Sequence, residues 1–359
     1  MELDQSVIER TNLVAPVASV GCTQPRWPVD GRVAAFLADT CVFCQPWWLE
    51  AVAPDRWDVA VAMRGHEVAA VWPYAYRIRL RRYRLIEIPE LTFYLGPWLR
   101  PSSAKYARRL AEEKDLIGEL VDALPPFAVF QQWLHPSVGN WLPLYWKGFS
   151  QTTRYTYRYE ATADLDAIWA EVRENIRTDI RKAAKQLVVV EETDPIRFLA
   201  LQRATFARQG LPLPFSADTL QRLDRECAAR RARTILVAVD SRGRAHSAVY
   251  LVSDRRTMYS LLRASDPDLR ASGAGSLVVW ECIRRAAAAG KAFDFLGSWV
   301  EPIERFVRAF GARQTAFFEI GKATSTVVRG YRALYRCCRG AGLLSRGGGV
   351  LGAIQGRDS

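Results

Sequence analysis

Histidine is scarce in this chain, which has three among 359 residues: His66, His135 and His246. They lie far apart in sequence, so the chain offers few residues for a histidine metal site or a Ser-His-Asp triad unless folding brings them together. Cysteine occurs seven times, an odd number that predicts no disulfide framework. Cys41 and Cys44 have no second pair at zinc spacing, so we expect two buried thiols at a helix start and no metal.

Long apolar segments are missing as well. No run approaches the roughly 20 residues of a membrane-spanning helix, and residues 1–5 carry no basic stretch followed by an apolar one. We therefore expect a cytoplasmic protein without a signal peptide or anchor. Hydrophobic residues make up 49% and charged residues 25% of the chain, an ordinary globular balance, and the length favours two domains.

Basic residues outnumber acidic ones, and the net charge is +12. Such a balance favours polyanionic partners such as tRNA, nucleotides or anionic lipid, and it does not bear on the fold. Residues 327–339 combine arginines with apolar residues in the pattern of a basic amphipathic helix. This segment is predicted to contact a membrane surface peripherally, with RNA binding or docking on the protein itself as alternatives.

The second half is organised around residues 257–298. Their pattern predicts a strand at 258–262, a loop at 266–275, an amphipathic helix through Ala289 and a second strand at 292–296. The loop contains Arg270-x-x-Gly273-x-Gly275 directly before the helix. The spacing is neither that of a Walker loop nor that of the dinucleotide fingerprint.

Glycines at this place let the backbone approach a ligand closely, and free N–H groups at a helix N-terminus favour an anion such as a pyrophosphate. The candidate donor-phosphate-binding residues are Arg270, Gly273, Ala274, Gly275 and Ser276. A glycine-softened turn at a helix start is the alternative interpretation.

The two halves share an order of elements. Residues 59–71 and 236–249 each predict a hairpin with a glycine turn, and each is followed by strand, loop, helix, strand, a short aromatic helix and a last strand. The first half has a predicted strand at 91–97 and lacks the glycine loop, since residues 96–103 stand in its place. We infer two copies of one α/β unit, of which only the second holds the donor.

Six patches in this order resemble the FemAB-like acyltransferases of the GNAT superfamily, which carry tandem GNAT domains. The loop at Arg270 is similar to the Gln/Arg-x-x-Gly-x-Gly/Ala loop with which GNAT enzymes hold the pyrophosphate of coenzyme A. The resemblance covers about residues 33–322, and its patches are 89–97, 146–149, 177–185, 208–210, 273–280 and 293–298.

The resemblance implies two tandem GNAT-like domains, each a mixed, mainly antiparallel sheet flanked by helices. The predicted division is a flexible N-terminal arm at 1–30, a degenerate GNAT-like domain at 31–160, a GNAT-like acyltransferase domain at 161–322, and a basic C-terminal helix with a Gly-rich tail at 323–359.

The resemblance also implies an N-acyltransferase that acts on the primary amine of a small molecule or peptide, without a bound cofactor. The best-known members use aminoacyl-tRNA, which the order of elements and the basic charge favour. An acyl-CoA donor is the alternative, favoured by the intact loop at Arg270. Peptidoglycan-type members have Phe-Lys where this chain has Phe306 and Val307, which argues against a muropeptide acceptor. A non-catalytic protein that binds RNA or a membrane surface is a further alternative.

In the GNAT fold the oxyanion is usually stabilised by a backbone N–H of the strand before the loop, here within 258–263. Tyr259, Glu281 and Asp294 are the candidate catalytic residues for proton transfer. A backbone hydrogen bond made by Asp294 and a solvated position for Glu281 are the competing interpretations.

A long helix is predicted at 165–186, with a basic row beside an apolar stripe at i+4 spacing. The basic row, together with two arginines of the last short helix, supplies the candidates for acceptor or tRNA binding; a solvated helix face is the alternative. These residues are Arg177, Arg181, Lys182, Lys185, Arg305 and Arg308.

Overall fold

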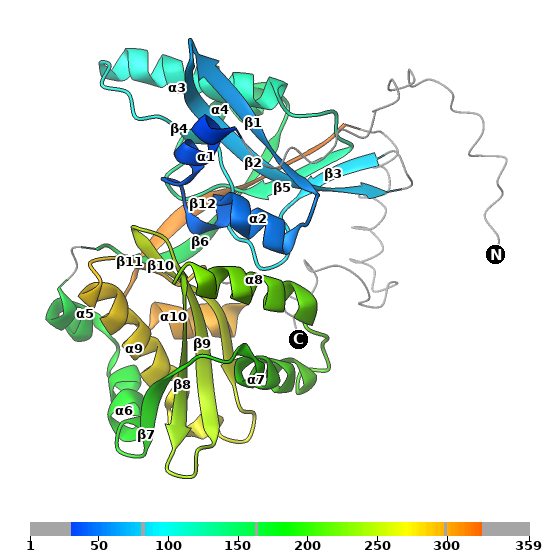
Figure 1. Cartoon of the computed structure of the whole chain (residues 1–359). Coiled ribbons are helices and arrows are strands. Elements are labelled where there is room, and N and C mark those ends of the chain that lie inside the picture. Colours follow the sequence, from blue (N-terminus) through cyan, green and yellow to red (C-terminus); the bar gives the residue numbers. More distant parts are fainter. Residues whose placement is uncertain (1–29, 80–82, 162–163, 298–299, 325–359) are drawn as a thin grey trace, which may run out of the picture.

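A computed structural model describes residues 30–79, 83–161, 164–297 and 300–324 (Figure 1). Within this part of the chain, one sheet of 12 strands runs in the order β1-β2-β3-β5-β12-β6-β11-β10-β9-β8-β7, and β4 pairs with β2. Most neighbouring strands are antiparallel, but β3 and β5 are parallel, as are β10 and β11. The predicted α/β class and the mixed, mainly antiparallel sheet flanked by helices are confirmed.

The strands fall into two sets of six along the chain. Those of the first half are β1 Trp57–Arg64, β2 Glu67–Arg79, β3 Tyr83–Glu87, β4 Trp98–Leu99, β5 Val129–Trp133 and β6 Ser150–Tyr159. Those of the second half are β7 Leu187–Glu192, β8 Arg233–Asp240, β9 Ala245–Ser253, β10 Thr257–Ser265, β11 Ala292–Asp294 and β12 Arg313–Ala323.

Helices cover both faces of the sheet, with α7 and α8 on one side of the second half and α5, α6 and α9 on the other (Figure 1). In the first half they are α1 Gly31–Leu37, η2 Val42–Cys44, α2 Pro46–Val52, α3 Tyr106–Asp122 and α4 Leu142–Trp146. In the second half they are α5 Leu165–Glu171, α6 Glu174–Ala183, α7 Pro195–Ala207, α8 Ala217–Ala229, η3 Arg270–Ser272, α9 Ala274–Ala288 and α10 Glu301–Arg308.

The predicted duplication is visible in the topology. Each half contains an antiparallel hairpin, β1–β2 or β8–β9, then a strand, a long helix and a parallel strand, β3-α3-β5 or β10-α9-β11. The last strands are exchanged, because β12 pairs with β5 of the first half while β6 pairs with β11 of the second. The strand β12, which the predicted division assigns to 161–322, therefore completes the sheet of the other half.

The predicted strand at 91–97 is wrong. Leu91 has a φ of 57°, outside the range of extended backbone, and only Leu95 forms an isolated bridge, with Leu134. The N–H of Leu95 donates to the carbonyl of Trp133 (3.0 Å), so a single tertiary contact replaces a ladder.

The single helix predicted at 165–186 is also wrong. The backbone is extended at Val172 (ψ 128°) and at Arg173 (ψ 144°), which separates α5 from α6. The N–H of Arg173 donates to the carbonyl of Ala309 at the end of α10 (2.9 Å). Because Val172 is buried at the break, the apolar stripe still faces the core, and its other members Ile168, Ile176 and Ile180 are buried too.

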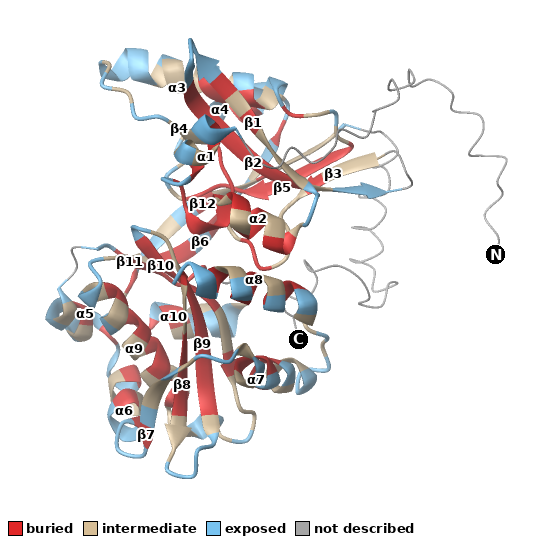
Figure 2. Cartoon of the chain, viewed as in Figure 1, coloured by how far each residue is buried: buried red, intermediate tan, exposed pale blue. Residues whose placement is uncertain are grey.

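Three hydrophobic clusters form the core, and buried residues concentrate on the central strands (Figure 2). One cluster joins the halves, since it includes Trp48 and Tyr94 of the first half and Phe198 and Tyr250 of the second. The second lies between the sheet and α6 and α9, and the third lies under α3. Burial of this continuous apolar surface holds both halves together.

Cys41 and Cys44 are two buried thiols at a helix start, as predicted. Both thiols are buried at the ends of η2, with their sulfurs 3.6 Å apart. Among the described residues no group of three or more His, Cys, Asp or Glu side chains has the arrangement of a metal site. No described helix is long and apolar enough to cross a bilayer.

Candidate functional site

The strands β10 and β11 separate in the second half. They pair in parallel only from Thr257 with Ala292 to Tyr259 with Asp294, although β10 continues for six more residues. Along 260–265, β10 has no partner strand on that side within the described residues. We call this opening between the diverging strands the splay.

A bulge lies on β10 at the beginning of the splay. Ser260 pairs with Leu251 and Leu262 pairs with Tyr250, so Leu261 is the extra residue. The extra residue of a bulge does not take part in the regular ladder, which leaves its N–H available to another acceptor. Within the predicted stretch 258–263, Leu261 is thus the residue whose amide the bulge takes out of the regular ladder.

The loop at Arg270 forms the entrance to α9. It contains the short η3 helix, and then Gly273 with a φ of 76° caps α9. The amides of Gly275 and Ser276 meet no acceptor among the described residues, as expected in the first turn of a helix. Arg270 is exposed and donates only to the carbonyl of Pro267 (3.3 Å). The turn thus presents free donors and one cation, which is the composition of an anion site.

The surroundings of this turn show how much room each glycine leaves for a side chain. A Cβ at Gly273 would lie 2.7 Å from the carbonyl oxygen of Asp179, so α6 forms one wall. A Cβ at Gly275 would meet only the hydroxyl of Ser247, at 3.9 Å. Ser247 in turn lies 3.0 Å from the hydroxyl of Ser265, so β9 and β10 form the floor. The predicted donor-phosphate residues therefore lie together at one end of β10.

Asp294 is fully buried at the last pair of β11. Its carboxylate accepts hydrogen bonds from the hydroxyl of Thr156 (2.6 Å) and the N–H of Leu296 (2.8 Å), and Arg158 lies 3.7 Å away. Burial raises the pKa of this carboxyl, while Arg158 and the hydrogen bonds oppose the rise. Its bond to Leu296 fixes the turn that carries the chain away from β10. This arrangement supports a positioning role better than a free base.

Tyr259 points toward the first half. Its hydroxyl donates to Asp254 (3.0 Å), and the same carboxylate oxygen accepts the N–H of Val42 in η2 (3.2 Å). Burial raises the pKa of the Tyr259 phenol well above its ordinary value, so the phenol stays protonated. The side chain links the halves.

Glu281 lies on the outer side of α9. It pairs with Arg284 (2.8 Å) and Arg285 (3.4 Å), and Arg285 also pairs with Glu191 of β7. The structure thus does not bring the three predicted catalytic side chains together: Asp294 lies at the splay, Tyr259 faces Asp254, and Glu281 belongs to a surface network.

The sequence analysis did not find the partners of Asp294. Tyr94 approaches it to 3.4 Å, Thr156 and Arg158 come from β6, and the ring of His135 packs against Tyr94 with centroids 5.4 Å apart. Tyr94 lies in the patch 89–97, which supported the family resemblance but did not indicate a contact between Tyr94 and Asp294. The exchange of β6 into the second half brings Thr156 and Arg158 to Asp294, and Tyr94 reaches it from the segment before β4.

His135 gives this region a pH dependence. Burial lowers its pKa to about 3, and the N–H of Ser137 donates to its Nδ1 (3.1 Å), so the ring is neutral in the fold. Unfolded histidine titrates near 6.5, so this stability is present above that pH and is lost as pH falls from 6.5 toward 3. Between pH 7 and pH 5 the free energy of unfolding should fall by about 2 kcal/mol through this residue.

His135→Gln should remove this part of the acid sensitivity. Urea unfolding of both proteins at pH 7 and pH 5 measures the difference. An equal loss of stability in the two proteins would contradict the role given to His135.

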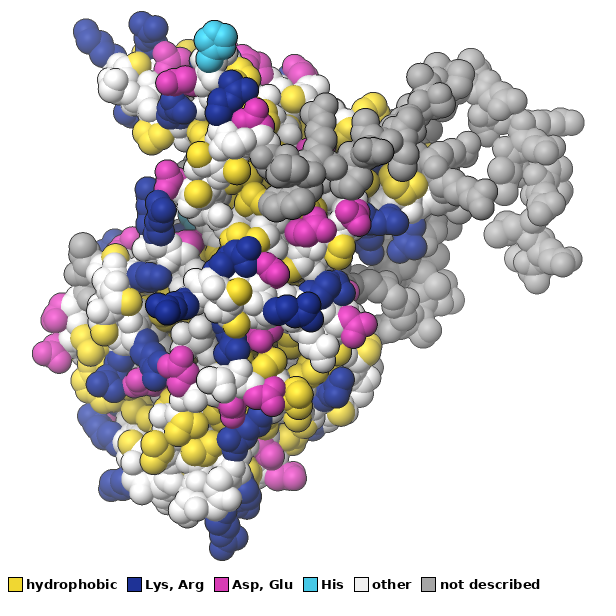
Figure 3. Space-filling model, in the orientation of Figure 1, with side chains coloured by type: hydrophobic (Ala, Val, Ile, Leu, Met, Phe, Trp, Pro, Cys, Tyr) yellow, Lys and Arg dark blue, Asp and Glu magenta, His cyan; other side chains and the backbone are white. Residues whose placement is uncertain are grey.

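Four of the six basic candidates are in ion pairs. Arg177 and Arg181 both pair with Glu174, while Arg305 pairs with Glu301 and Arg308 with Glu304. Lys182 and Lys185 are exposed and make no ion pair among the described residues. On the face shown in Figure 3, basic and acidic side chains are interspersed. This pattern favours a solvated surface over a continuous nucleic-acid track. The predicted arm at 1–30, except Asp30, and the predicted basic contact at 327–339 lie outside the described residues.

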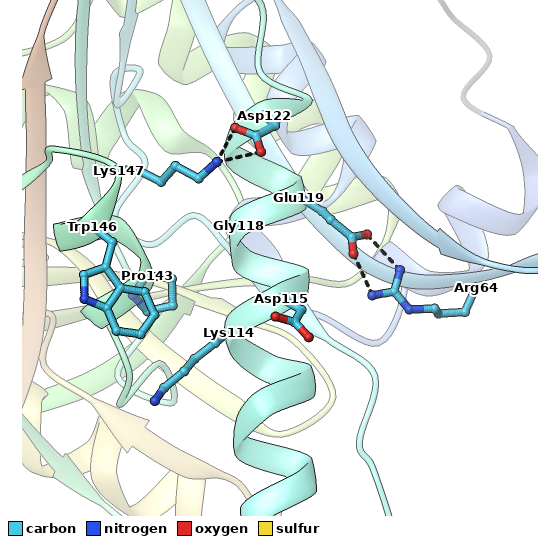
Figure 4. A pocket seen from close by; sticks show the side chains of 9 residues that line it. All are labelled: Arg64, Lys114, Asp115, Gly118, Glu119, Asp122, Pro143, Trp146 and Lys147. Atoms are coloured by element: carbon cyan, nitrogen blue, oxygen red, sulfur yellow. Dashed lines mark hydrogen bonds and ion pairs between the residues drawn. The ribbon is translucent and has the colours of Figure 1, made fainter.

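A hollow of about 400 Å³ lies in the first half, between α3 and α4 (Figure 4). Four of its six charged side chains pair within it, since Lys147 contacts Asp122 (2.6 Å) and Arg64 contacts Glu119 (2.7 Å). None of the predicted site residues lines this hollow, so it does not form part of the donor site.

Comparisons with known proteins agree with this geometry. Residues 170–313 match the family described as acetyltransferase (GNAT) domain. The crystal structure of FemX has a TM-score of 0.60 at 12% identity, covering 81% of this chain and 96% of that chain. No curated protein matches the sequence.

Weaker likenesses are to two further solved structures. L-PGS from Bacillus licheniformis has a TM-score of 0.46 at 9% identity, covering 79% of this chain and 89% of that chain. A tandem GNAT protein from the clavulanic acid biosynthesis pathway has a TM-score of 0.45 at 10% identity, covering 76% and 85%.

Proposed function

Since the chain is an acyltransferase of the GNAT superfamily with a FemAB-like fold, we propose that it transfers an acyl group from a coenzyme A thioester to a primary amine. The observation that carries this choice of donor is the turn before α9. There the amides of Gly275 and Ser276 meet no acceptor among the described residues, and the exposed guanidinium of Arg270 donates only to the carbonyl of Pro267. A diphosphate supplies the negative oxygens that such donors bind.

The splay lies next to this turn and accommodates the acyl end of the donor. With the diphosphate at the start of α9, the thioester lies along β10 where β11 has departed. The N–H of Leu261 then donates to the thioester oxygen and stabilises its negative charge during the reaction.

The transfer requires little side-chain chemistry. The neutral amine attacks the carbonyl carbon, a C–N bond forms, the C–S bond breaks, and the thiol leaves with the proton released by the amine. Asp294 positions the turn beyond β11, and it thereby keeps the splay open.

Aminoacyl-tRNA remains the second candidate donor, favoured by the likeness to the FemX fold and by the net charge of +12. Six arginines and one aspartate lie in 325–359, outside the described residues. Ion pairs on α6 and α10 argue against a tRNA-binding surface there, since they occupy Arg177, Arg181, Arg305 and Arg308. We therefore place the thioester donor first.

Arg270→Ala should weaken coenzyme A binding about tenfold, because it removes one charge-assisted hydrogen bond of about 1.5 kcal/mol. Isothermal titration with coenzyme A measures this change. Arg255→Ala is the matched control, since Arg255 is also exposed and pairs only with Asp39. If the unaltered protein binds no coenzyme A but transfers an amino acid from charged tRNA, the second donor is correct.

A further inference from the structure

Two buried polar atoms on β10 have no hydrogen-bond partner in the part of the chain that the structure describes. They are the Nη1 atom of Arg263 and the hydroxyl of Ser260, whose residue is only 3% exposed. Both lie in the stretch where β10 has lost β11 as a neighbour. Arg263 is half-buried as a residue, but its Nη1 atom is shielded from water without an acceptor, and such an atom destabilises a fold. An acceptor supplied by a ligand would satisfy it.

The bulge places both groups on the same face of β10. Tyr259, Leu261 and Ala264 pack into the cluster that joins the halves, so Ser260 and Arg263 face the opposite side, toward α9. The charge of Arg263 opposes the rise in pKa that burial causes at the thiol of Cys282. Cys282 lies in α9, so this interaction agrees with an Arg263 side chain that faces α9.

No acidic side chain among the described residues neutralises Arg263. Glu281, the acidic residue of α9, pairs with Arg284 and Arg285. Asp294 is held by Thr156 and Arg158. Burial lowers the pKa of Arg263 to about 10, so the guanidinium still carries its charge at neutral pH.

The position of Arg263 relative to the reacting carbonyl limits how far from that carbonyl an anionic group of the ligand lies. Arg263 follows Leu261 by two residues, which is about 7 Å along a strand. A short acyl chain with a terminal carboxylate spans this distance, as does the carboxylate of an amino acid whose amine attacks. An ammonium beside the carbonyl, as in an aminoacyl ester, would meet a like charge.

We propose that Arg263 and Ser260 bind a carboxylate of the substrate within the splay. The inference rests on the proposed function, because it places a donor carbonyl at Leu261. The carboxylate belongs either to the acyl group of a dicarboxylic thioester or to the amine acceptor, and the two sources are separable by experiment.

Isothermal titration with succinyl-CoA and butyryl-CoA tests the first source, since their acyl groups have equal length and differ in the terminal carboxylate. The unaltered protein should bind succinyl-CoA at least tenfold more tightly. Arg263→Met should abolish this preference while leaving the affinity for butyryl-CoA unchanged. Arg255→Met, in an exposed ion pair with Asp39, should keep the preference.

Transfer assays test the second source by comparing lysine with 1,5-diaminopentane, the same amine without its carboxylate. A preference for lysine that Arg263→Met abolishes, with equal binding of the two thioesters, assigns the carboxylate to the acceptor. If neither assay shows a preference that depends on Arg263, the inference is overturned. Binding of coenzyme A in the same experiments would still support the proposed function. No binding of any coenzyme A derivative overturns the proposed function.

Thermal unfolding distinguishes a ligand-binding arginine from a structural one, because the two roles predict opposite changes in the Tm of Arg263→Met. Because Arg263→Met removes a buried Nη1 that has no acceptor among the described residues, the Tm should rise by at least about 2 °C. A lower Tm would assign Arg263 to the packing of α9 and would overturn the inference whichever donor is used.

Discussion

Asp294→Ala should lower the free energy of unfolding by about 3–5 kcal/mol, because it leaves a buried cation without its partner. Asp294 is fully buried, and Arg158 exposes only 12% of its side chain. The substitution also removes the acceptor for the hydroxyl of Thr156 and for the N–H of Leu296. Urea denaturation of the unaltered protein and the variant measures the loss.

Asp294→Asn separates the positioning role from a catalytic one. The amide oxygen still accepts from Thr156 and Leu296, so most of the stability should remain. If Asp294 only holds the turn, the rate of acyl transfer by Asp294→Asn should stay within a few-fold of the unaltered protein. A loss of about 100-fold or more with a native Tm would instead identify Asp294 as a general base.

Gly273→Ala should cost about 2–4 kcal/mol of stability. Its φ of 76° is a left-handed conformation that costs a residue with a Cβ about 1–2 kcal/mol. The added Cβ would also lie 2.7 Å from the carbonyl oxygen of Asp179, a backbone atom of α6 that cannot turn away. Thermal and urea unfolding together measure this effect.

Gly275→Ala is the matched control two residues further along. Its Cβ would meet only the Ser247 hydroxyl at 3.9 Å, and alanine is a better helix former than glycine. Its stability should therefore be unchanged or higher by up to about 1 kcal/mol. Equal stability of the two variants would show that α6 does not press against the turn.

Local patterns predicted most of the elements. The hairpins β1–β2 and β8–β9 followed from alternating residues around Gly65 and Gly243, and both glycines have positive φ. The helices α7 and α8 begin at side-chain caps, which the carboxylate of Asp194 and the hydroxyl of Ser216 supply. These features depend on neighbours in sequence, which a single chain displays.

The errors have the opposite cause. The helix predicted at 165–186 breaks where Arg173 bonds to Ala309, and the strand predicted at 91–97 gives way to one bond between Leu95 and Trp133. In both places a partner more than 35 residues away sets the backbone, and periodicity carries no information about it.

For the site, the sequence by itself determined the turn at Arg270, because glycines before an amphipathic helix already specify free amides and close backbone approach. It also determined the order of elements shared by the two halves. Only the tertiary structure decided that β6 and β12 change places and that Tyr94 and Arg158 reach Asp294. It also decided that Nη1 of Arg263 is buried without a partner among the described residues. Strand exchange and the pairing of buried charges are relations between distant segments, so they exist only once the chain is folded.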